Sequence, residues 1–444
     1  MDRNREHESP STAGDGETAD VARTSRAGIQ RRTVLGSGLG VAATAGLLEV
    51  GLAPTASAHT EGRDCALANK SAHALYTLPE DHKWHTGGIY ETGQLEEWYY
   101  WTGFLTDTVT KEEYGLFYNV FHEATAPGEF RYRVWFALYN LDKNEYVWAV
   151  QNMEVPLTAT APHGRHSRNS FQYSAHTDNT RFKTTYHARH NIWSLQMSTV
   201  GSNVAEPINL DLRLRTRDPY GYIPMTPYGL ENENQPWTGV PDPATMYSLS
   251  YYYGGPKTDI TGTVTTGAKV HHLEGSLWFE HQWGNFSVAT QPWGSAYIWS
   301  ALQLNDGSIF TFRQWYNEAL KPLLNLGRHS YSTPTNGTIY GFGESVEFTP
   351  LQTWHSPVSN RNFPVYGRLS TEFGTWYYSP VFPNYEIPFG YPPYGTSNLD
   401  IWEAPCLLHT GSLTGPVVGT AFLELPNVLT ASAAHLKLLD GSPS

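Results

Sequence analysis

Apolar and polar residues alternate along much of the chain, and Gly, Pro, Asn and Asp interrupt this alternation at short intervals. Such a pattern is typical of β-strands that bury one face, whereas the 3.6-residue repeat of an amphipathic helix is scarce. Residues 209–215 show the alternation most clearly, with Leu at every second position. Residues 301–304 and 309–313 flank an Asn-Asp-Gly-Ser turn at 305–308, so we predict a hairpin there. The pattern predicts an all-β protein with many short strands.

Aromatic residues make up 14% of the chain and include 15 Trp and 28 Tyr. Many short strands joined by tight turns are typical of sandwiches and barrels. This number of large side chains exceeds what a small barrel can pack inside, so we expect an internal cavity. Residues 218–245 and 380–397 are rich in Pro and Gly, and we interpret them as loops at the mouth of a site or as surface decoration.

The N-terminal region differs from the rest of the chain. Arg31 and Arg32 precede a weakly apolar run at 34–52, which ends in Ala-Ser-Ala at 56–58. These features are typical of a cleaved secretory signal, and the paired arginines favour the twin-arginine route. The alternative is a membrane anchor, but the glycines and Glu49 in the run make a poor spanning helix. We predict that residues 1–58 are a disordered leader and signal peptide, and that the exported remainder has no stable membrane insertion.

The remaining length suits two domains at roughly 100–200 residues each, and we place them at 59–287 and 288–444. A formal net charge of −13 argues against a nucleic-acid or anionic-membrane partner, since both require a basic face. Cys65 and Cys406 lie near the two ends of the predicted mature chain. Export permits a disulfide between them, but the sequence does not set their distance, so two separate thiols are the alternative.

Four groups of motifs follow one another along the chain: EEWYYWTG at 96–103, SYYYGGP at 250–256, EGSLWFEHQWGNF at 274–286 followed by WSALQLNDG at 299–307, and IWE at 401–403 followed by GTAFLEL at 419–425. In order and spacing they resemble the carotenoid 1,2-hydratase (hydroxyneurosporene synthase)/AttH-like family. That family also includes kievitone hydratase-like enzymes and lipocalin-like Diels–Alderases. The resemblance implies two lipocalin-like β-barrel domains with a ligand cavity at or between them, and a largely hydrocarbon, unsaturated substrate.

Glu280, His281 and Trp283 are the predicted catalytic residues. Hydrating an alkene requires an acid that protonates carbon, and a carboxylic acid kept neutral by an apolar cavity can supply that proton. The face of an indole can stabilise the resulting cation. We therefore predict Glu280 as proton donor, with His281 as its partner or as the base that activates water, although alternation places them on opposite faces of a strand. The alternative is that Glu280 or His281 is paired for structure at the domain junction.

A larger set of residues is predicted to bind the substrate: Glu97, Trp98, Tyr99, Tyr118, Tyr251, Tyr252, Trp299, Gln303, Arg313, Trp402 and Glu403. Packing is the alternative role for the aromatic residues, and an exposed carboxylate is the alternative for Glu97. Histidines three positions apart, such as His82 and His85, point to opposite faces of a strand, so we expect no metal site. No cofactor motif is present in the sequence, and we expect no cofactor.

The sequence departs from the family pattern at one strand. In the bacterial carotenoid hydratases the resemblance implies an aspartate on the strand after the His-x-Trp motif, but residues 308–315 contain no carboxylate. This departure counts against carotenoid hydration in particular. The sequence therefore predicts an exported, cofactor-independent enzyme that hydrates or cyclises an unsaturated, largely apolar metabolite of isoprenoid or polyketide type. One alternative is a non-catalytic lipocalin-like carrier of an apolar ligand. A weaker alternative is a secreted hydrolase, and the absence of a GxSxG motif from the sequence counts against it.

Overall fold

The structure is a computed structural model of the whole chain. It describes residues 76–85, 96–126, 129–153, 158–160, 170–216, 221–225, 229–232, 249–284, 297–315, 328–332, 339–343, 346–388 and 401–426. All described residues belong to one compact unit of the chain, Ala56–Ser444.

Several predictions about the chain's organisation fall outside the described residues. They are the leader and signal at 1–58, the domain boundary between residues 287 and 288, most of the long loops, and Cys65. Cys406 is fully buried, and its pairing with Cys65 stays a prediction.

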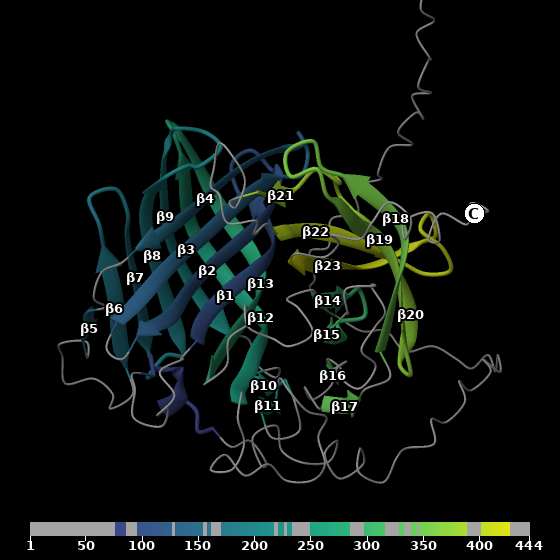
Figure 1. Cartoon of the computed structure of the whole chain (residues 1–444), viewed down its shortest axis with the longest axis horizontal. Coiled ribbons are helices and arrows are strands. Elements are labelled where there is room, and N and C mark those ends of the chain that lie inside the picture. The colour runs from purple at the N-terminus through teal and green to yellow at the C-terminus, as the bar shows by residue number, and fades with distance from the viewer. Residues whose placement is uncertain are drawn as a thin grey trace, which may run out of the picture. The chain divides into compact units, whose positions relative to one another are not determined.

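A 13-stranded antiparallel sheet contains the described strands that precede residue 285, and it curves into a nearly closed, barrel-like form (Figure 1). In hydrogen-bonding order its strands are β4 (Glu145–Met153), β3 (Glu129–Asn140), β2 (Glu113–Ala126), β1 (Glu96–Asp107), β13 (Lys269–Gly284), β12 (Leu249–Thr266), β9 (Pro207–Thr216), β8 (Ile192–Val200), β7 (Arg181–His187), β6 (Phe171–His176) and β5 (Thr158–Thr160), with β10 (Ile223–Pro224) and β11 (Leu230–Asn232) paired to β12. We call it the first sheet.

A ten-stranded antiparallel sheet, the second sheet, contains the described strands from residue 297 onward and curves into half a barrel. Its order is β17 (Ile339–Gly343), β16 (Arg328–Ser332), β15 (Ile309–Trp315), β14 (Tyr297–Leu304), β23 (Val417–Pro426), β22 (Ile401–His409), β20 (Gly374–Pro380), β19 (Asn362–Thr371) and β18 (Val346–His355), with β21 (Glu386–Ile387) paired to β22.

The described residues contain one short helix, the 3-10 turn η1 (Glu80–His82). No helix in this part of the chain is long and apolar enough to cross a membrane. The predicted all-β fold of two lipocalin-like barrels is confirmed, with the second sheet forming only half a barrel. The predicted hairpin is also confirmed, since β14 ends at Leu304 and β15 begins at Ile309.

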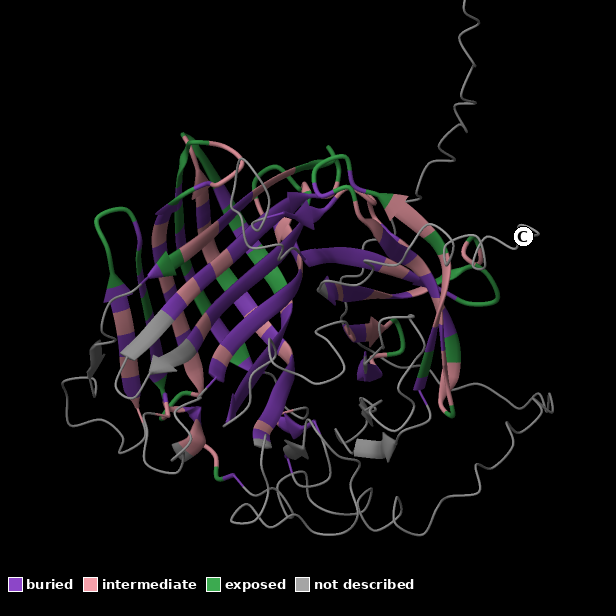
Figure 2. Ribbon diagram, viewed as in Figure 1, coloured by how far each residue is buried: buried purple, intermediate pink, exposed green. Residues whose placement is uncertain are grey.

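Burial along the strands separates two kinds of strand in the first sheet. In β9 every second residue is buried and the intervening residues are exposed, which is the pattern of a strand with one solvated face. In β1 and the second half of β13 nearly every residue is buried. Figure 2 shows this contrast as nearly continuous purple on the strands beside the second sheet and as banded colours on strands farther away.

The two buried faces of β1, β12 and β13 belong to different hydrophobic cores. Tyr99 and Tyr253 pack in the interior of the first sheet. Tyr100, Tyr252 and Trp278 pack together with residues of the second sheet. Because successive side chains of a strand point to opposite faces, these three strands present one set of residues to each core.

Candidate functional site

The pairing of β1, β13 and β12 places predicted site residues side by side. Tyr99 and Tyr253 both lie opposite His281 in the register of the sheet, on its inner face. Tyr100 lies opposite Glu280 on the other face. The predicted residues therefore form two clusters, one on each face.

The histidine cluster, which consists of His85, Glu97 and His281, lies on the inner face. Glu97 Oε1 lies 2.7 Å from Nε2 of His281 and 3.0 Å from Nδ1 of His85. Glu97 Oε2 accepts a hydrogen bond of 2.9 Å from the backbone N–H of His85. Glu97 and His281 are fully buried, so the alternative of an exposed Glu97 is wrong.

Tyr253 extends this cluster toward η1. Its hydroxyl lies 3.0 Å from Nδ1 of His281 and 2.5 Å from Nδ1 of His82, while the Tyr99 hydroxyl donates to the carbonyl of His82 at 2.8 Å. The ring of Tyr99 stacks on His281 with centroids 4.1 Å apart. A continuous chain of polar contacts thus runs from Glu97 through His281 and Tyr253 to His82.

The charges of the histidine cluster follow from burial and from the neighbouring groups. Burial raises the pKa of Glu97, but the charge of His85 and hydrogen bonds from both histidines outweigh it and lower this pKa to about 2. Burial lowers the pKa of His85, yet Glu97 and Asp81 raise it to about 9. Burial lowers the pKa of His281 to about 4, against the opposing effect of Glu97. At neutral pH an ionised Glu97 therefore lies between a cationic His85 and a neutral His281.

Glu280 lies on the other face of β13, enclosed by aromatic donors. Its Oε2 accepts hydrogen bonds from the Tyr252 hydroxyl at 2.5 Å and from Nε1 of Trp278 at 3.0 Å. Its Oε1 lies 3.4 Å from Nε1 of Trp98. The Tyr252 hydroxyl also accepts a 3.0 Å hydrogen bond from Nε1 of Trp299 in β14. Glu280 is therefore connected to the second sheet through Tyr252.

Two more carboxyl groups lie on neighbouring strands of the second sheet, where Glu403 of β22 pairs with Glu424 of β23. The Tyr100 hydroxyl donates to Glu403 Oε1, and the Tyr297 hydroxyl donates to Glu424 Oε1. The Tyr139 hydroxyl donates to the backbone carbonyl of Glu403 at 2.5 Å. We call Glu280, Glu403 and Glu424 the carboxyl cluster.

Burial raises the pKa of all three groups. The pKa values of Glu280 and Glu424 rise to about 7, although hydrogen-bond donors and Arg313 oppose the rise. Burial and the neighbouring Glu424 raise the pKa of Glu403 well above its usual range. The carboxyl cluster therefore retains protons near neutral pH, as a general acid requires.

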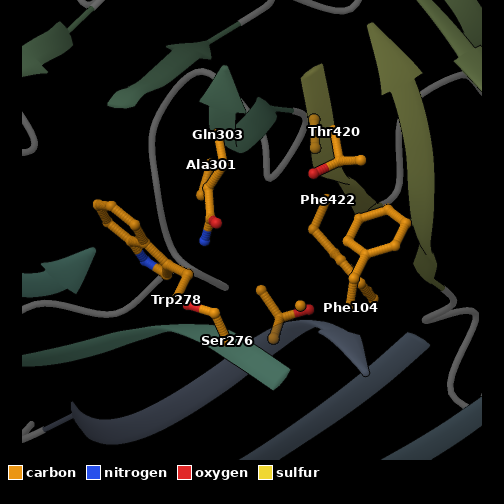
Figure 3. Close-up of a pocket in the computed structure, with 10 residues that line it drawn as sticks. Phe104, Ser276, Trp278, Ala301, Gln303, Thr420 and Phe422 are labelled. Atoms are coloured by element: carbon orange, nitrogen blue, oxygen red, sulfur yellow. The ribbon is translucent and has the colours of Figure 1, made fainter. Parts of the chain in front are cut away.

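A cavity of about 180 Å³ lies between β1 and β13 of the first sheet and β14 and β23 of the second (Figure 3). Its lining residues are Thr102, Gly103, Phe104, Ser276, Trp278, Ala301, Gln303, Thr420, Ala421 and Phe422. Trp278 lines this cavity and also donates to Glu280, so one indole connects the carboxyl with the cavity. The volume is comparable with cavities of about 150 Å³ that hold benzene.

Gly254 allows Trp278 to take this position. A Cβ atom at Gly254 would lie 2.7 Å from the indole ring of Trp278, closer than real Cβ contacts. The glycine in the predicted SYYYGGP motif therefore serves the packing of an indole against the backbone of β12.

Comparison with known proteins supports the resemblance seen in the sequence. Residues 69–427 match the sequence model of a family described as AttH-like. The chain belongs to the AttH-like family. No protein of curated function matches the chain in sequence.

This AttH-like chain is similar to several solved structures. An AttH-type protein from Nitrosomonas europaea is 19% identical with a TM-score of 0.60, over 82% of this chain and 100% of that one. Kievitone hydratase from Nectria haematococca is 14% identical with a TM-score of 0.46, over 74% and 88% of the two chains. CghA in complex with Sch210972 is 13% identical with a TM-score of 0.48, over 76% and 89%. The similarity to the Nitrosomonas europaea protein establishes a shared fold and no activity.

The AttH-like fold separates two residues that the sequence analysis combined. Glu280 and His281 hydrogen bond to different groups on opposite faces of β13, so His281 is not the hydrogen-bond partner of Glu280. Trp283 lies with His281, and its ring stacks on His85 with centroids 4.3 Å apart. Tyr251 stacks on the other side of this group, 5.1 Å from Trp283.

Three other predicted residues make contacts within the protein, and their role in substrate binding stays a prediction. The ring of Tyr118 stacks on Trp101 in the interior of the first sheet. Trp402 is fully buried, and its Nε1 donates to the carbonyl of Pro383 at 2.7 Å. Gln303 lines the cavity, and its Nε2 donates to the carbonyl of Pro256 at 3.3 Å.

Sequence reasoning missed two residues of these clusters. His85 was considered only together with His82, three positions away, but its contacts are with Glu97 and His281 on two different strands. Glu424 was part of the GTAFLEL motif, and only the pairing of β22 with β23 brings it beside Glu403. In neither case does a local pattern identify the partner.

Proposed function

We propose that this AttH-like chain is a cofactor-independent enzyme that protonates an unsaturated, largely apolar metabolite of isoprenoid or polyketide type, with Glu280 as proton donor. The supporting observation is a buried carboxyl, surrounded by Tyr252, Trp278 and Trp98, beside a cavity between the two sheets. Because burial raises its pKa to about 7, Glu280 is partly protonated at neutral pH. An acid with a pKa near the working pH is well suited to proton transfer.

The proposed step balances without a cofactor. Glu280 donates its proton to one alkene carbon, and the neighbouring carbon becomes a cation that the indole of Trp278 stabilises. In hydration, water adds to the cation and returns one proton to the Glu280 carboxylate. In cyclisation, a second double bond attacks the cation, and loss of a proton to Glu280 ends the reaction. His281 and Trp283 take no part in this step, since they lie on the other face of β13.

A non-catalytic carrier is the second candidate function. None of the described residues that line the cavity is ionisable, and this composition suits passive binding of an apolar ligand equally well. The cavity by itself therefore does not distinguish an enzyme from a carrier. Whether the bound ligand is converted or returned unchanged does distinguish them.

We also propose export by the twin-arginine route, supported by Arg31, Arg32 and the Ala-Ser-Ala segment at 56–58. Replacing both arginines with lysine is expected to retain the protein in the cytoplasm of its host. Continued export of that variant at the wild-type level contradicts the proposal.

The function is tested by incubating the untagged full chain with a lipid-soluble metabolite extract and following the mass and retention time of each compound. A gain of one water indicates a hydratase, and an unchanged mass with a new retention time indicates a cyclase or isomerase. Glu280→Gln is expected to lower turnover at least about 100-fold, while Glu274→Gln, exposed on the same strand, keeps it. Return of every bound compound unchanged supports the carrier, and full activity of Glu280→Gln rules out Glu280 as the acid.

A further inference from the structure

We propose that His85, Glu97 and His281 bind one divalent transition-metal ion of the zinc type. One ligand atom from each residue lies within 4.8 Å of the others. The three residues come from the segment after η1, from β1 and from β13, so only the folded chain assembles them. Two imidazole nitrogens with one carboxylate oxygen form a donor set that binds zinc in many proteins. No metal site was predicted from the sequence. The proposed site is independent of the proposed function.

Each ligand residue has its second polar atom held by another group. Nδ1 of His281 contacts the Tyr253 hydroxyl at 3.0 Å. Nε2 of His85 lies 3.5 Å from Oδ1 of Asp81. Glu97 Oε2 accepts the backbone N–H of His85 at 2.9 Å. Outer-shell partners of this kind orient histidine and carboxylate ligands in metal sites.

The atoms that remain converge on one point. Nε2 of His281 and Nδ1 of His85 lie 2.7 Å and 3.0 Å from Glu97 Oε1. Ligand atoms at about 2.0–2.1 Å from a tetrahedral zinc lie about 3.3 Å apart, so they need to separate by a few tenths of an ångström. When the metal binds, the proton on Nδ1 of His85 leaves, and the single proton of neutral His281 moves from Nε2 to Nδ1, where it donates to the Tyr253 hydroxyl oxygen.

Access to the site is through His85. The side chain of His85 is 23% exposed, whereas Glu97 is fully buried. A metal ion therefore enters from the side of His85, where a water molecule can complete its coordination. The bound ion would join residues 76–85 to β1 and β13, on the opposite face of β13 from Glu280.

The first test uses the untagged full chain after treatment with a chelator and removal of that chelator. Titration with Co²⁺ is expected to give one equivalent per chain, with visible absorption typical of mixed nitrogen and oxygen ligands, and one equivalent of Zn²⁺ is expected to abolish that absorption. Zn²⁺ is also expected to raise the thermal unfolding midpoint. Absence of a saturable Co²⁺ or Zn²⁺ equivalent in the wild-type chain overturns the proposal, and this outcome needs no variant.

Variants test which residues bind the single equivalent of metal ion. His85→Ala, which changes the most exposed ligand, is expected to weaken binding at least 100-fold, and Tyr253→Phe about 10- to 100-fold. The control is the double variant His187→Ala/His190→Ala, which removes two exposed histidines also three positions apart and is expected to bind like the wild type. If a folded His85→Ala chain binds the metal ion with wild-type affinity, or if the control variant no longer binds it, the assignment of the site to His85, Glu97 and His281 is wrong. The catalytic proposal at Glu280 stands or falls separately.

Discussion

On the inner face of β13, His281 contacts an ionised Glu97, whereas on the other face of the same strand Glu280 is surrounded by indole and phenol groups and retains a proton. Both carboxyl groups are buried, and burial by itself raises the pKa of each. The difference comes from the neighbours. Glu97 has a cationic partner in His85, while Glu280 has neutral donors and the more weakly acting charge of Arg313.

The same residue type therefore takes different charge states on the two faces of the first sheet. A buried carboxylate next to a cation stays ionised, whereas burial without a close cation raises the pKa of a carboxyl, even where neutral donors oppose the rise. The inner face therefore offers an anion that suits a cation or a metal ion. The face toward the second sheet offers an acid.

The largest expected effect concerns the ion pair of the inner face. Glu97→Gln removes the buried anion beside His85 and leaves it the partly exposed Asp81, so we expect the free energy of unfolding to fall by about 3–5 kcal/mol. Urea unfolding in chelator-treated buffer measures this loss. Glu274→Gln is the control and is expected to unfold like the wild type, since Glu274 is exposed. A loss below about 1 kcal/mol for Glu97→Gln shows that the pair behaves like a surface salt bridge.

The next effect concerns the pH dependence of the opposite face. Glu280 has a pKa of about 7 in the folded chain and an ordinary value of 4.5, so the folded chain binds the extra proton between these values. Stability therefore falls as pH rises through this window, by up to about 3 kcal/mol, and the loss is complete above the folded pKa. Glu280→Gln lacks this contribution. Unfolding free energies of both chains from about pH 4 to 8 measure the difference, and parallel curves contradict the raised pKa.

A smaller effect is expected from filling the space at Gly254. Gly254→Ala places a Cβ atom against the indole of Trp278, so the ring must move away from Glu280. We expect a stability loss of about 1–3 kcal/mol and a change in near-ultraviolet circular dichroism. Turnover is expected to fall as well, because Trp278 connects Glu280 with the cavity. Unchanged stability with an unchanged spectrum shows that the indole does not rest on this glycine.

The smallest expected effect concerns the hydrogen bond from Tyr252 to Glu280. Tyr252→Phe removes a donor that lowers the pKa of Glu280, so that pKa is expected to rise, by up to about one unit. The pH above which turnover declines moves upward accordingly, and stability falls by about 1 kcal/mol. Tyr251→Phe, at the adjacent position but on the inner face, is the matched control and leaves the pH profile unchanged. Equal shifts in both variants contradict the separation of the two faces.

The amino-acid sequence was sufficient to predict the fold class, several strands and the family. Alternation at residues 209–215 identifies a strand with one buried face, and the turn at 305–308 identifies a hairpin, because both signals are local. The order and spacing of the aromatic motifs were sufficient for the AttH-like family. Alternation also places Glu280 and His281 on opposite faces, since side chains in a strand repeat every two residues.

The groups that contact each face of the first sheet are known only from the tertiary structure. His85 reaches Glu97 from the segment after η1, and Glu403 meets Glu424 through the pairing of β22 with β23. These contacts join residues whose positions depend on long-range pairing, which no local pattern specifies. The charge of a carboxyl depends on its burial and on the groups around it. For this reason the sequence located Glu97 and Glu280, but the contact with His85 made Glu97 an anion, and burial on the face toward the second sheet made Glu280 an acid.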